Sequence, residues 1–216
     1  MEKTRPNLYK LLKSEFKKID SILDVGCGYM DDLIDFEYSG FQELKGIDKG
    51  ITYKPYIDYC LVKLGEQPTD IPDTSERRVL NKYVNERFKT QGGEAGDLTK
   101  YNYIPDSVSF IICNNVLHFF PDEQKLELIG KFYQALQSEG LLYVKINHRD
   151  NLLYKDAERI EKISEGVYRS IHTDENIRMF LYPIDQEAFF HQLADYDIVS
   201  KYNCRNEDNF AFVIRK

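Results

Sequence analysis

An apolar stretch that ends in an acid and two glycines constrains the fold of this chain more than any other feature. Residues 21–28 read Ser-Ile-Leu-Asp-Val-Gly-Cys-Gly, so a short strand runs directly into a turn that contains Gly26 and Gly28. Glycine adopts backbone angles that are closed to other residues, and it has no side chain to block a ligand. Open α/β sheets bind ligands at the carboxyl ends of their strands. The stretch therefore predicts such a sheet, with a ligand lying against the main chain after the first strand.

A second acid comes at the end of the next apolar stretch. Residues 44–48 read Leu-Lys-Gly-Ile-Asp, which indicates a strand that ends at Asp48, about twenty residues after the glycine turn. An acid in this position accepts hydrogen bonds from the hydroxyl groups of a ribose. Together, the glycine turn and Asp48 predict a site for a nucleoside-containing cofactor.

The order of the remaining elements predicts the fold class. Apolar periodicity and turn residues place strands and helices in alternation, and two strands separated by a polar loop end the chain. We expect strands at residues 22–25, 44–47, 88–91, 107–113 and 141–146, helices at 7–19, 31–36 and 123–137, and a closing hairpin of 198–203 with 210–214. This order predicts an α/β fold with a doubly wound, mostly parallel seven-stranded sheet and an antiparallel C-terminal hairpin.

Capping residues and irregular segments complete this outline. We expect Asp122 to cap the helix at 123–137, with Gly140 after its end, and Asp185 to cap a further helix through Leu193. The segments 51–88 and 147–180 are less regular, and residues 155–163 of the second are expected to be helical. We interpret both segments as elaborations on a single domain of residues 1–216, since no linker or repeat divides the chain.

Composition narrows the class of protein. No apolar run is long enough to cross a bilayer, and residues 1–6 lack the apolar core of a secretory signal, so we expect a cytoplasmic protein. The four cysteines are scattered without a CxxC pair, which predicts neutral, mostly buried thiols rather than a zinc site or disulfides. The net charge is −7, which favours a small-molecule substrate over a nucleic acid. The one basic cluster, which is typical of a solvated helix face, comprises Lys10, Lys13, Lys17 and Lys18.

At this point the chain resembles the class I S-adenosylmethionine-dependent methyltransferases. The resemblance runs from about residue 21 to residue 216 and depends on four stretches in order rather than on any one of them. They are Leu23-Asp24-Val25-Gly26-Cys27-Gly28, Gly46-Ile47-Asp48, Gly96-Asp97-Leu98, and the segment after residue 109 that reads Phe-Ile-Ile-Cys-Asn-Asn-Val-Leu-His-Phe-Phe. One position departs from the pattern, because Met30 stands where many members have another glycine.

The resemblance implies a Rossmann-like methyltransferase fold and a role for each matching residue. It implies that the backbone at Gly26 and Gly28 lies beside the amino-acid portion of S-adenosyl-L-methionine and that Asp24 contacts its ammonium group. Asp48 would bind the ribose diol, and Asp97 would accept from the adenine amino group. The remaining matches are Leu98, which would pack on the adenine ring, and Asn114, which would face the methyl donor.

The residues on the side of the methyl acceptor are less clearly marked. His118 is the sequence candidate for a catalytic base near the mouth of the site, with a packed, hydrogen-bonded histidine as the alternative. His148 and His172 could also reach the site, and the tyrosines that could line an acceptor pocket are Tyr53, Tyr56, Tyr154 and Tyr168. Asp97 could instead only shape an Asx-turn, and Asn114 could only satisfy backbone groups.

Three functions remain open at this stage. The leading hypothesis is an S-adenosylmethionine-dependent methyltransferase with a small-molecule acceptor, and its first alternative is a protein that binds the cofactor without catalysis, as a sensor or partner subunit. A nicotinamide-dependent oxidoreductase is disfavoured, because the third glycine of its G-x-G-x-x-G fingerprint would fall at position 31, where this chain has Asp31. No metal and no membrane partner are expected, and the oligomeric state is not readable.

Overall fold

We analysed a computed structural model of the chain, which describes residues 19–28, 32–33, 36, 41, 43–48, 94–156, 158–171, 179–204 and 209–216. Several expectations fall outside these residues. They are the helix at 7–19 with its basic cluster, most of the helix at 31–36, Met30, the elaboration at 51–88 with Tyr53 and Tyr56, the strand at 88–91, and His172.

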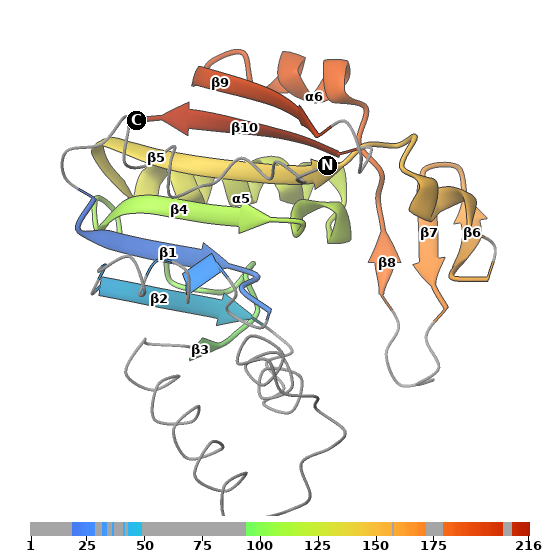
Figure 1. Cartoon of the computed structure of the whole chain (residues 1–216), viewed down its shortest axis with the longest axis horizontal. Coiled ribbons are helices and arrows are strands. Elements are labelled where there is room, and N and C mark those ends of the chain that lie inside the picture. Colours follow the sequence, from blue (N-terminus) through green and yellow to red (C-terminus); the bar gives the residue numbers. More distant parts are fainter. Residues whose placement is uncertain are drawn as a thin grey trace, which may run out of the picture.

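A mixed sheet forms the centre of the molecule (Figure 1). Its strand order is β3-β2-β1-β4-β5-β10-β9, and only β10 runs antiparallel to its neighbours β5 and β9. The strands are β1 (Ser21–Val25), β2 (Glu43–Asp48), β3 (Glu94–Ala95), β4 (Val108–Asn114), β5 (Leu136–Asn147), β9 (Asp197–Cys204) and β10 (Asn209–Arg215). The expected mostly parallel sheet with an antiparallel C-terminal hairpin is thereby confirmed.

The strand order reverses between β1 and β4. The chain builds β1, β2 and β3 toward one edge of the sheet and then returns to add β4 and β5 on the other side of β1. In open α/β sheets, such a switch point opens a crevice at the carboxyl ends of the strands, and ligands bind there. The topology therefore directs attention to the residues that follow β1, β2 and β4.

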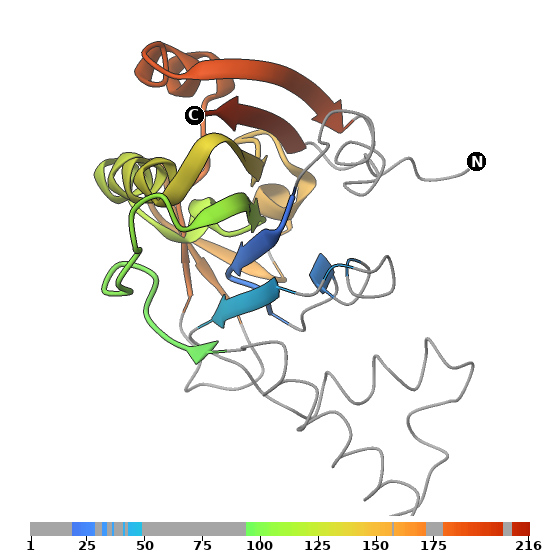
Figure 2. The ribbon, with the colours of Figure 1, turned by 90° about the vertical axis from the view of Figure 1, so that its left-hand side faces the viewer.

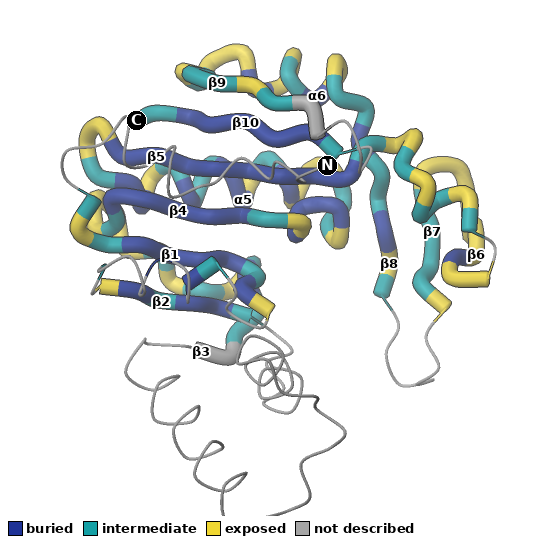
Figure 3. The backbone as a smooth tube through the Cα atoms, viewed as in Figure 1, coloured by how far each residue is buried: buried dark blue, intermediate teal, exposed yellow. Residues whose placement is uncertain are grey.

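Helix α5 (Asp122–Ala135) covers one face of the sheet (Figures 1 and 2). Side chains alternate between the faces of a strand, so every second residue of β1, β4 and β5 points toward this helix. The cluster that results contains Leu23, Val25, Ile111, Cys113, Leu142, Val144, Leu128, Ile129 and Phe132. Figure 3 shows that the central strands are buried along nearly their whole length. Asp24, Asn114 and Lys145 occupy the alternate positions, on the opposite face.

Three expected boundaries were wrong. The two-residue strand β3 lies at Glu94–Ala95, where we expected a turn. Helix α5 begins at Asp122, which does not cap it because its carboxylate binds Lys125 Nζ at 2.6 Å. The helix also ends earlier than expected, because Leu136 is fully buried as the first residue of β5, and Gly140 therefore lies inside that strand.

The capping prediction at Asp185 is confirmed. Its side chain accepts hydrogen bonds from the backbone N–H groups of Glu187 and Ala188 at the start of α6 (Gln186–Gln192). The bond from Ala188 is the leading reason that the pKa of Asp185 is lowered, and the charge of Arg149 and the bond from Glu187 add to it. None of the helices in the described part of the chain is long and apolar enough to cross a membrane.

The second irregular segment contains a small antiparallel sheet rather than the helix expected at 155–163. A short 3-10 helix, η2 (Leu152–Lys155), leads into β6 (Ile160–Ser164), β7 (Val167–Ser170) and β8 (Phe180–Leu181). The left-handed backbone of Gly166, at φ +70°, permits the tight turn between β6 and β7, and so favours a hairpin over a helix. This small sheet lies beyond the carboxyl ends of β4 and β5 (Figure 1).

Candidate functional site

The glycine turn after β1 is attached to the end of β2. The backbone N–H groups of Gly26 and Cys27 both donate to the carbonyl of Ile47, at 2.7 and 3.2 Å. Gly26 has φ +71°, and a Cβ atom there would come within 2.3 Å of Val116 Cγ2. Gly28 has φ +50°, but a Cβ atom there would meet nothing within 4 Å. Both glycines therefore adopt the backbone angles expected of them, and only Gly26 is enclosed by the protein.

Asp48 is oriented by the same turn. The N–H of Gly28 donates to Asp48 Oδ2 at 3.0 Å, and the N–H of Gly96 donates to the carbonyl of Asp48 at 2.9 Å. These two bonds tie the carboxyl end of β2 to the turn on one side and to the residue after β3 on the other. The acid at the end of β2 thus has a defined position beside the main chain of Gly28.

Asp97 and Leu98 follow β3. Asp97 Oδ1 accepts from the N–H of Thr99 at 3.0 Å and from its hydroxyl at 2.8 Å, which is the Asx-turn that the sequence left open for this residue. Leu98 is buried and belongs to the hydrophobic core beside α5. The structure therefore brings Asp97 and Leu98 to the same edge as Asp48 and gives each of them a structural contact there.

Asp24 lies inside the sheet rather than in the turn. It is buried in β1, across from Gly46 of β2 and Ile112 of β4. The thiol of Cys27 lies close by, and its pKa is raised first by burial and then by the charges of Asp24 and Asp48. Burial likewise raises the pKa of Cys113. Both thiols are therefore neutral, as expected, and neither is suited to act as a nucleophile.

Asn114 ends β4 with its two amide atoms in different environments. Its Nδ2 donates to Asp32 Oδ2 at 3.0 Å, and a carboxylate oxygen can only accept, so the amide has this orientation and not the flipped one. Its Oδ1 is buried and has no hydrogen-bond partner among the described residues. Sequence analysis did not single out Asp32, since nothing in the glycine turn shows that its carboxylate meets β4.

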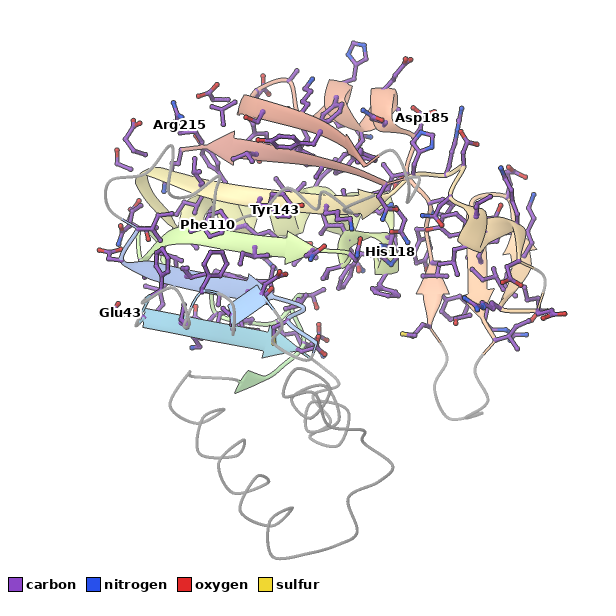
Figure 4. All side chains as sticks on the ribbon, viewed as in Figure 1. Glu43, Phe110, His118, Tyr143, Asp185 and Arg215 are labelled. Atoms are coloured by element: carbon purple, nitrogen blue, oxygen red, sulfur yellow. The ribbon has the colours of Figure 1, made fainter. Side chains whose placement is uncertain are left out.

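His118 lies in η1 (Leu117–Phe119), directly after β4 and beside β8 (Figure 4). Its side chain is only 3% exposed, and Nδ1 has no hydrogen-bond partner within the described part of the chain. Its carbonyl accepts from the N–H of Tyr182 at 2.7 Å. Burial, and then the charge of Lys125, lower the pKa of His118 to about 4. The imidazole is therefore neutral at pH 7.

Lys125 is a residue of this region that sequence analysis missed. It is fully buried, and its ammonium group donates to Asp122 Oδ1 at 2.6 Å and to the carbonyl of Tyr182 at 3.1 Å. Burial lowers its pKa, while Asp122 opposes that shift. The spacing of Lys125 from Leu128, Ile129 and Phe132 places it on the inner face of α5, and this spacing was visible in the sequence.

The other candidates on the acceptor side lie in or near the small sheet: Tyr154 in η2, Tyr168 in β7, and His148 directly after β5. The rings of Tyr154 and Tyr168 are 5.1 Å apart, and burial raises the pKa of Tyr154 to about 12. His148 Nδ1 accepts from the N–H of Asp150 at 3.2 Å. Within the residues described, no group of three or more His, Cys, Asp or Glu could hold a metal ion.

Comparisons with known proteins place this geometry in a known fold. No family model matches the sequence, and no curated protein is similar to it in sequence. Solved structures do match. An S-adenosylmethionine-dependent methyltransferase from Clostridium acetobutylicum aligns with a TM-score of 0.64 and 11% identity, covering 100% of this chain and 92% of its own. One from Methanosarcina mazei aligns with a TM-score of 0.63 and 15% identity, covering 96% of this chain and 97% of its own.

This chain has the methyltransferase fold. A third match is the 1,6-didemethyltoxoflavin N1-methyltransferase of Burkholderia thailandensis, with its substrate and S-adenosylhomocysteine bound. It aligns with a TM-score of 0.60 and 12% identity, covering 98% of this chain and 77% of its own. The three alignments span nearly the whole chain.

Proposed function

We propose that this chain is an S-adenosylmethionine-dependent methyltransferase that acts on a small-molecule acceptor, within one domain of residues 1–216. The observation that carries the proposal is the bond from Gly28 to Asp48, made at the carboxyl ends of β1 and β2, beside the switch point of a methyltransferase fold. It joins a left-handed glycine turn to an acid at the end of β2, and an acid in this position can bind the ribose of a nucleoside. The Burkholderia neighbour, whose structure contains both S-adenosylhomocysteine and 1,6-didemethyltoxoflavin, supports the same proposal.

The residues present fit this cofactor. The space over Gly28 would admit its amino-acid portion, and buried Asp24 would bind its ammonium group. Asp48 would bind the ribose diol, because a carboxylate can accept several hydrogen bonds in addition to the one from Gly28. Asp97, from its Asx-turn, would accept from the adenine amino group. The two remaining assignments are Leu98, against the ring, and Asn114, facing the methyl donor.

The cofactor and the protein would make different contributions to methyl transfer. Bound S-adenosylmethionine supplies an electrophilic methyl group on its sulfonium, and the protein supplies orientation. Holding the nucleophile close and in line contributes several kcal/mol of the rate acceleration in well-oriented reactions. The part of this chain that would orient the acceptor is the segment from Asn114 to His118. His118 would touch the acceptor, but with a pKa of about 4 it is a weak base at pH 7.

Calorimetry tests the proposal. We expect S-adenosylmethionine and S-adenosylhomocysteine to bind with dissociation constants well below about 1 mM. Asp48→Ala should weaken binding by about tenfold, the effect of losing roughly 1.4 kcal/mol of hydrogen bonding. Glu158→Gln is the control, since it removes one charge from an exposed side chain in the turn between η2 and β6. Failure of both compounds to bind would contradict the proposal. Equal affinity in the wild type and in the Asp48 variant would contradict only the ribose contact.

A second measurement separates catalysis from binding alone. Incubation with S-adenosylmethionine and a panel of small acceptors should release S-adenosylhomocysteine. Tight binding with no release across the panel would favour the non-catalytic cofactor-binding protein instead. Fluorescence with added NADH should show no binding, because the turn lacks the third glycine of a dinucleotide fingerprint.

A further inference from the structure

The turn after β3 is joined to the rest of the molecule at both ends. At its start, the N–H of Gly96 donates to the carbonyl of Asp48 at 2.9 Å, so the turn begins beside the acid that would bind the ribose. At its far end, the ring of Tyr103 meets the ring of Phe132 on α5 edge to face, with the ring centroids 5.3 Å apart. The turn therefore connects the cofactor edge of the sheet to the helix that covers the core.

Asp97, the first acid of this turn, is held by the residues that follow it. Its carbonyl accepts from the N–H groups of Lys100 and Tyr101, at 2.9 and 3.0 Å. Its Oδ1 accepts from the N–H of Thr99 at 3.0 Å and from the Thr99 hydroxyl at 2.8 Å. The ammonium group of Lys100 lies 3.7 Å from Oδ2, but its side chain is 82% exposed and constrains the carboxylate little. The orientation of the carboxylate therefore depends on Thr99.

A single peptide group connects this carboxylate to Tyr103. In the peptide between Leu98 and Thr99, the N–H of Thr99 donates to Asp97 Oδ1, and the carbonyl of Leu98 accepts from the Tyr103 hydroxyl at 3.1 Å. A peptide group is planar, so its carbonyl and its N–H can only turn together. The bond from Tyr103 therefore fixes the direction of the N–H that holds Asp97. Hydrogen bonds on both sides of one peptide group also polarise and strengthen each other.

The surroundings of Tyr103 keep its hydroxyl in place as a donor. Its ring contacts the rings of Tyr101 and Phe132, with centroids 4.9 and 5.3 Å away, so the hydroxyl has a defined position. Burial is the largest of the causes that raise the pKa of Tyr103, so the hydroxyl keeps its proton at pH 7. Leu98, whose carbonyl the hydroxyl reaches, is itself buried, and loss of the donor would leave that carbonyl poorly satisfied.

We propose that Tyr103 is a positioning residue for base recognition: its hydroxyl holds the peptide between Leu98 and Thr99 so that Asp97 can accept from the 6-amino group of adenine. This inference rests on the proposed function and deepens it, because it names the residue that sets the selectivity of the cofactor site for adenine over hypoxanthine. Tyr103 acts through Leu98 and Thr99 and does not touch the cofactor. Thr99 acts at the next step, through its own N–H and hydroxyl on Asp97.

Two ligands that differ at one group of the base test this role. They are S-adenosylhomocysteine and S-inosylhomocysteine, which carries a carbonyl oxygen in place of the 6-amino group. Calorimetry measures both dissociation constants. An oriented carboxylate accepts from the amino group and repels the carbonyl oxygen, so we expect the wild type to bind the adenosyl compound at least about tenfold more tightly. A ratio near one in the wild type would show that Asp97 does not read the base, and this result overturns the inference.

Tyr103→Phe tests the hydroxyl alone, because the ring and its contacts remain. We expect the affinity for S-adenosylhomocysteine to fall about fivefold while that for S-inosylhomocysteine stays within about twofold, so that most of the selectivity is lost. A merely structural role for Tyr103 would weaken both ligands equally and leave their ratio unchanged, which overturns the inference. Tyr133→Phe is the matched control, since it removes a hydroxyl from a ring that packs against Tyr196 instead of the turn, and its ratio should equal that of the wild type.

Thr99 provides a second test that does not depend on the fold of a Tyr103 variant. Thr99→Val keeps the shape of the side chain but removes the hydroxyl that donates to Asp97 Oδ1, so the ratio should fall as it does in Tyr103→Phe. Thr99→Ser restores a hydroxyl and should recover most of the selectivity. Equal ratios in Thr99→Val and the wild type would show that this turn does not orient the carboxylate, and the inference would be wrong.

The wild type separates this inference from the proposed function. If S-adenosylhomocysteine binds to the wild type but the ratio of the two affinities is the same in Tyr103→Phe, the positioning role is wrong and the methyltransferase proposal stands. If neither compound binds to the wild type, both proposals fall together.

Discussion

Main-chain N–H groups donate the hydrogen bonds that join the turn after β1 to the end of β2, whereas beyond β4 a buried side chain, Lys125, donates as well. In the first region, the backbone of Gly26, Cys27 and Gly28 makes three hydrogen bonds to Ile47 and Asp48. In the second, the ammonium group of Lys125 and the η1 backbone fix β8. Loss of one side chain, Lys125, would therefore remove a contact of the second region, whereas the first region keeps two bonds that involve main-chain atoms alone.

The two regions also differ in what burial does to their charged groups. Around the glycine turn, burial and two carboxylates keep the thiol of Cys27 protonated. Around η1, burial and a lysine keep His118 neutral. Both arrangements leave a titratable group uncharged at pH 7, but the nearby charges are two carboxylates in the first and a lysine paired with Asp122 in the second. The carboxylates of the first region suit a cationic sulfonium compound.

The largest effect that we expect on stability comes from Gly26→Ala. A Cβ atom there would lie 2.3 Å from Val116 Cγ2, on a backbone with φ +71°, so overpacking and the left-handed penalty add together. We expect the free energy of unfolding to fall by about 3 kcal/mol or more. Urea denaturation followed by circular dichroism measures this loss. A change below about 1 kcal/mol would show that the turn is not enclosed as described.

Lys125→Met tests whether side chains hold the second region. The carbonyl of Tyr182 would lose a buried donor, and we expect a loss of about 2 kcal/mol, with faster amide exchange at Tyr182. Lys131→Met is the matched control on the same helix, because its side chain, in a salt bridge to Glu127, is 32% exposed and water can replace its partners. Denaturation and hydrogen exchange of both variants make the comparison. Equal losses would mean that Lys125 does not fix β8.

Acid should weaken the second region through His118. The pKa of His118 is about 4 in the folded protein and 6.5 in an unfolded chain, so between these values the unfolded state binds more protons. The contribution of neutral His118 to the free energy of unfolding is therefore fully present above pH 6.5 and is lost as the pH falls toward 4. At pH 5 the loss from this residue is about 2 kcal/mol. Denaturation at pH 7 and pH 5 should show this loss in the wild type but not in His118→Asn. Parallel pH dependence in the two proteins would contradict the burial of a neutral imidazole.

The contrast between the regions also explains what the sequence could predict. The mostly parallel sheet, the C-terminal hairpin and the angles of the two glycines were predicted correctly, because each follows from local residue types and their spacing. The contacts of Asn114 with Asp32, and of Lys125 with Tyr182, join residues 82 and 57 positions apart. No periodicity carries such information, since it arises only when the chain folds.

The failed local predictions have a similar cause. Residues 155–163 carry the charge and spacing of a helix, but Gly166 and the pairing of Lys162 with Tyr168 make a hairpin there. Leu136 continues the apolar spacing of α5, but pairing with Val108 recruits it into β5. In the first place a local hairpin forms instead of the expected helix, and in the second a long-range strand pairing overrides the helical spacing. The roles of His118 and of all the cofactor residues, the two glycines included, stay predictions.

Gly28→Ala should have the smallest effect on stability and yet separate folding from binding. A Cβ atom there would meet nothing within 4 Å, so only the left-handed φ of +50° opposes it, at a cost of about 1 kcal/mol. That Cβ atom would project into the space that we assign to the amino-acid portion of the cofactor. We therefore expect S-adenosylhomocysteine to bind at least about tenfold more weakly by calorimetry while the protein stays folded. Unchanged affinity would place the cofactor away from Gly28, and the distinction between a backbone-lined and a side-chain-lined region of the site would then fail.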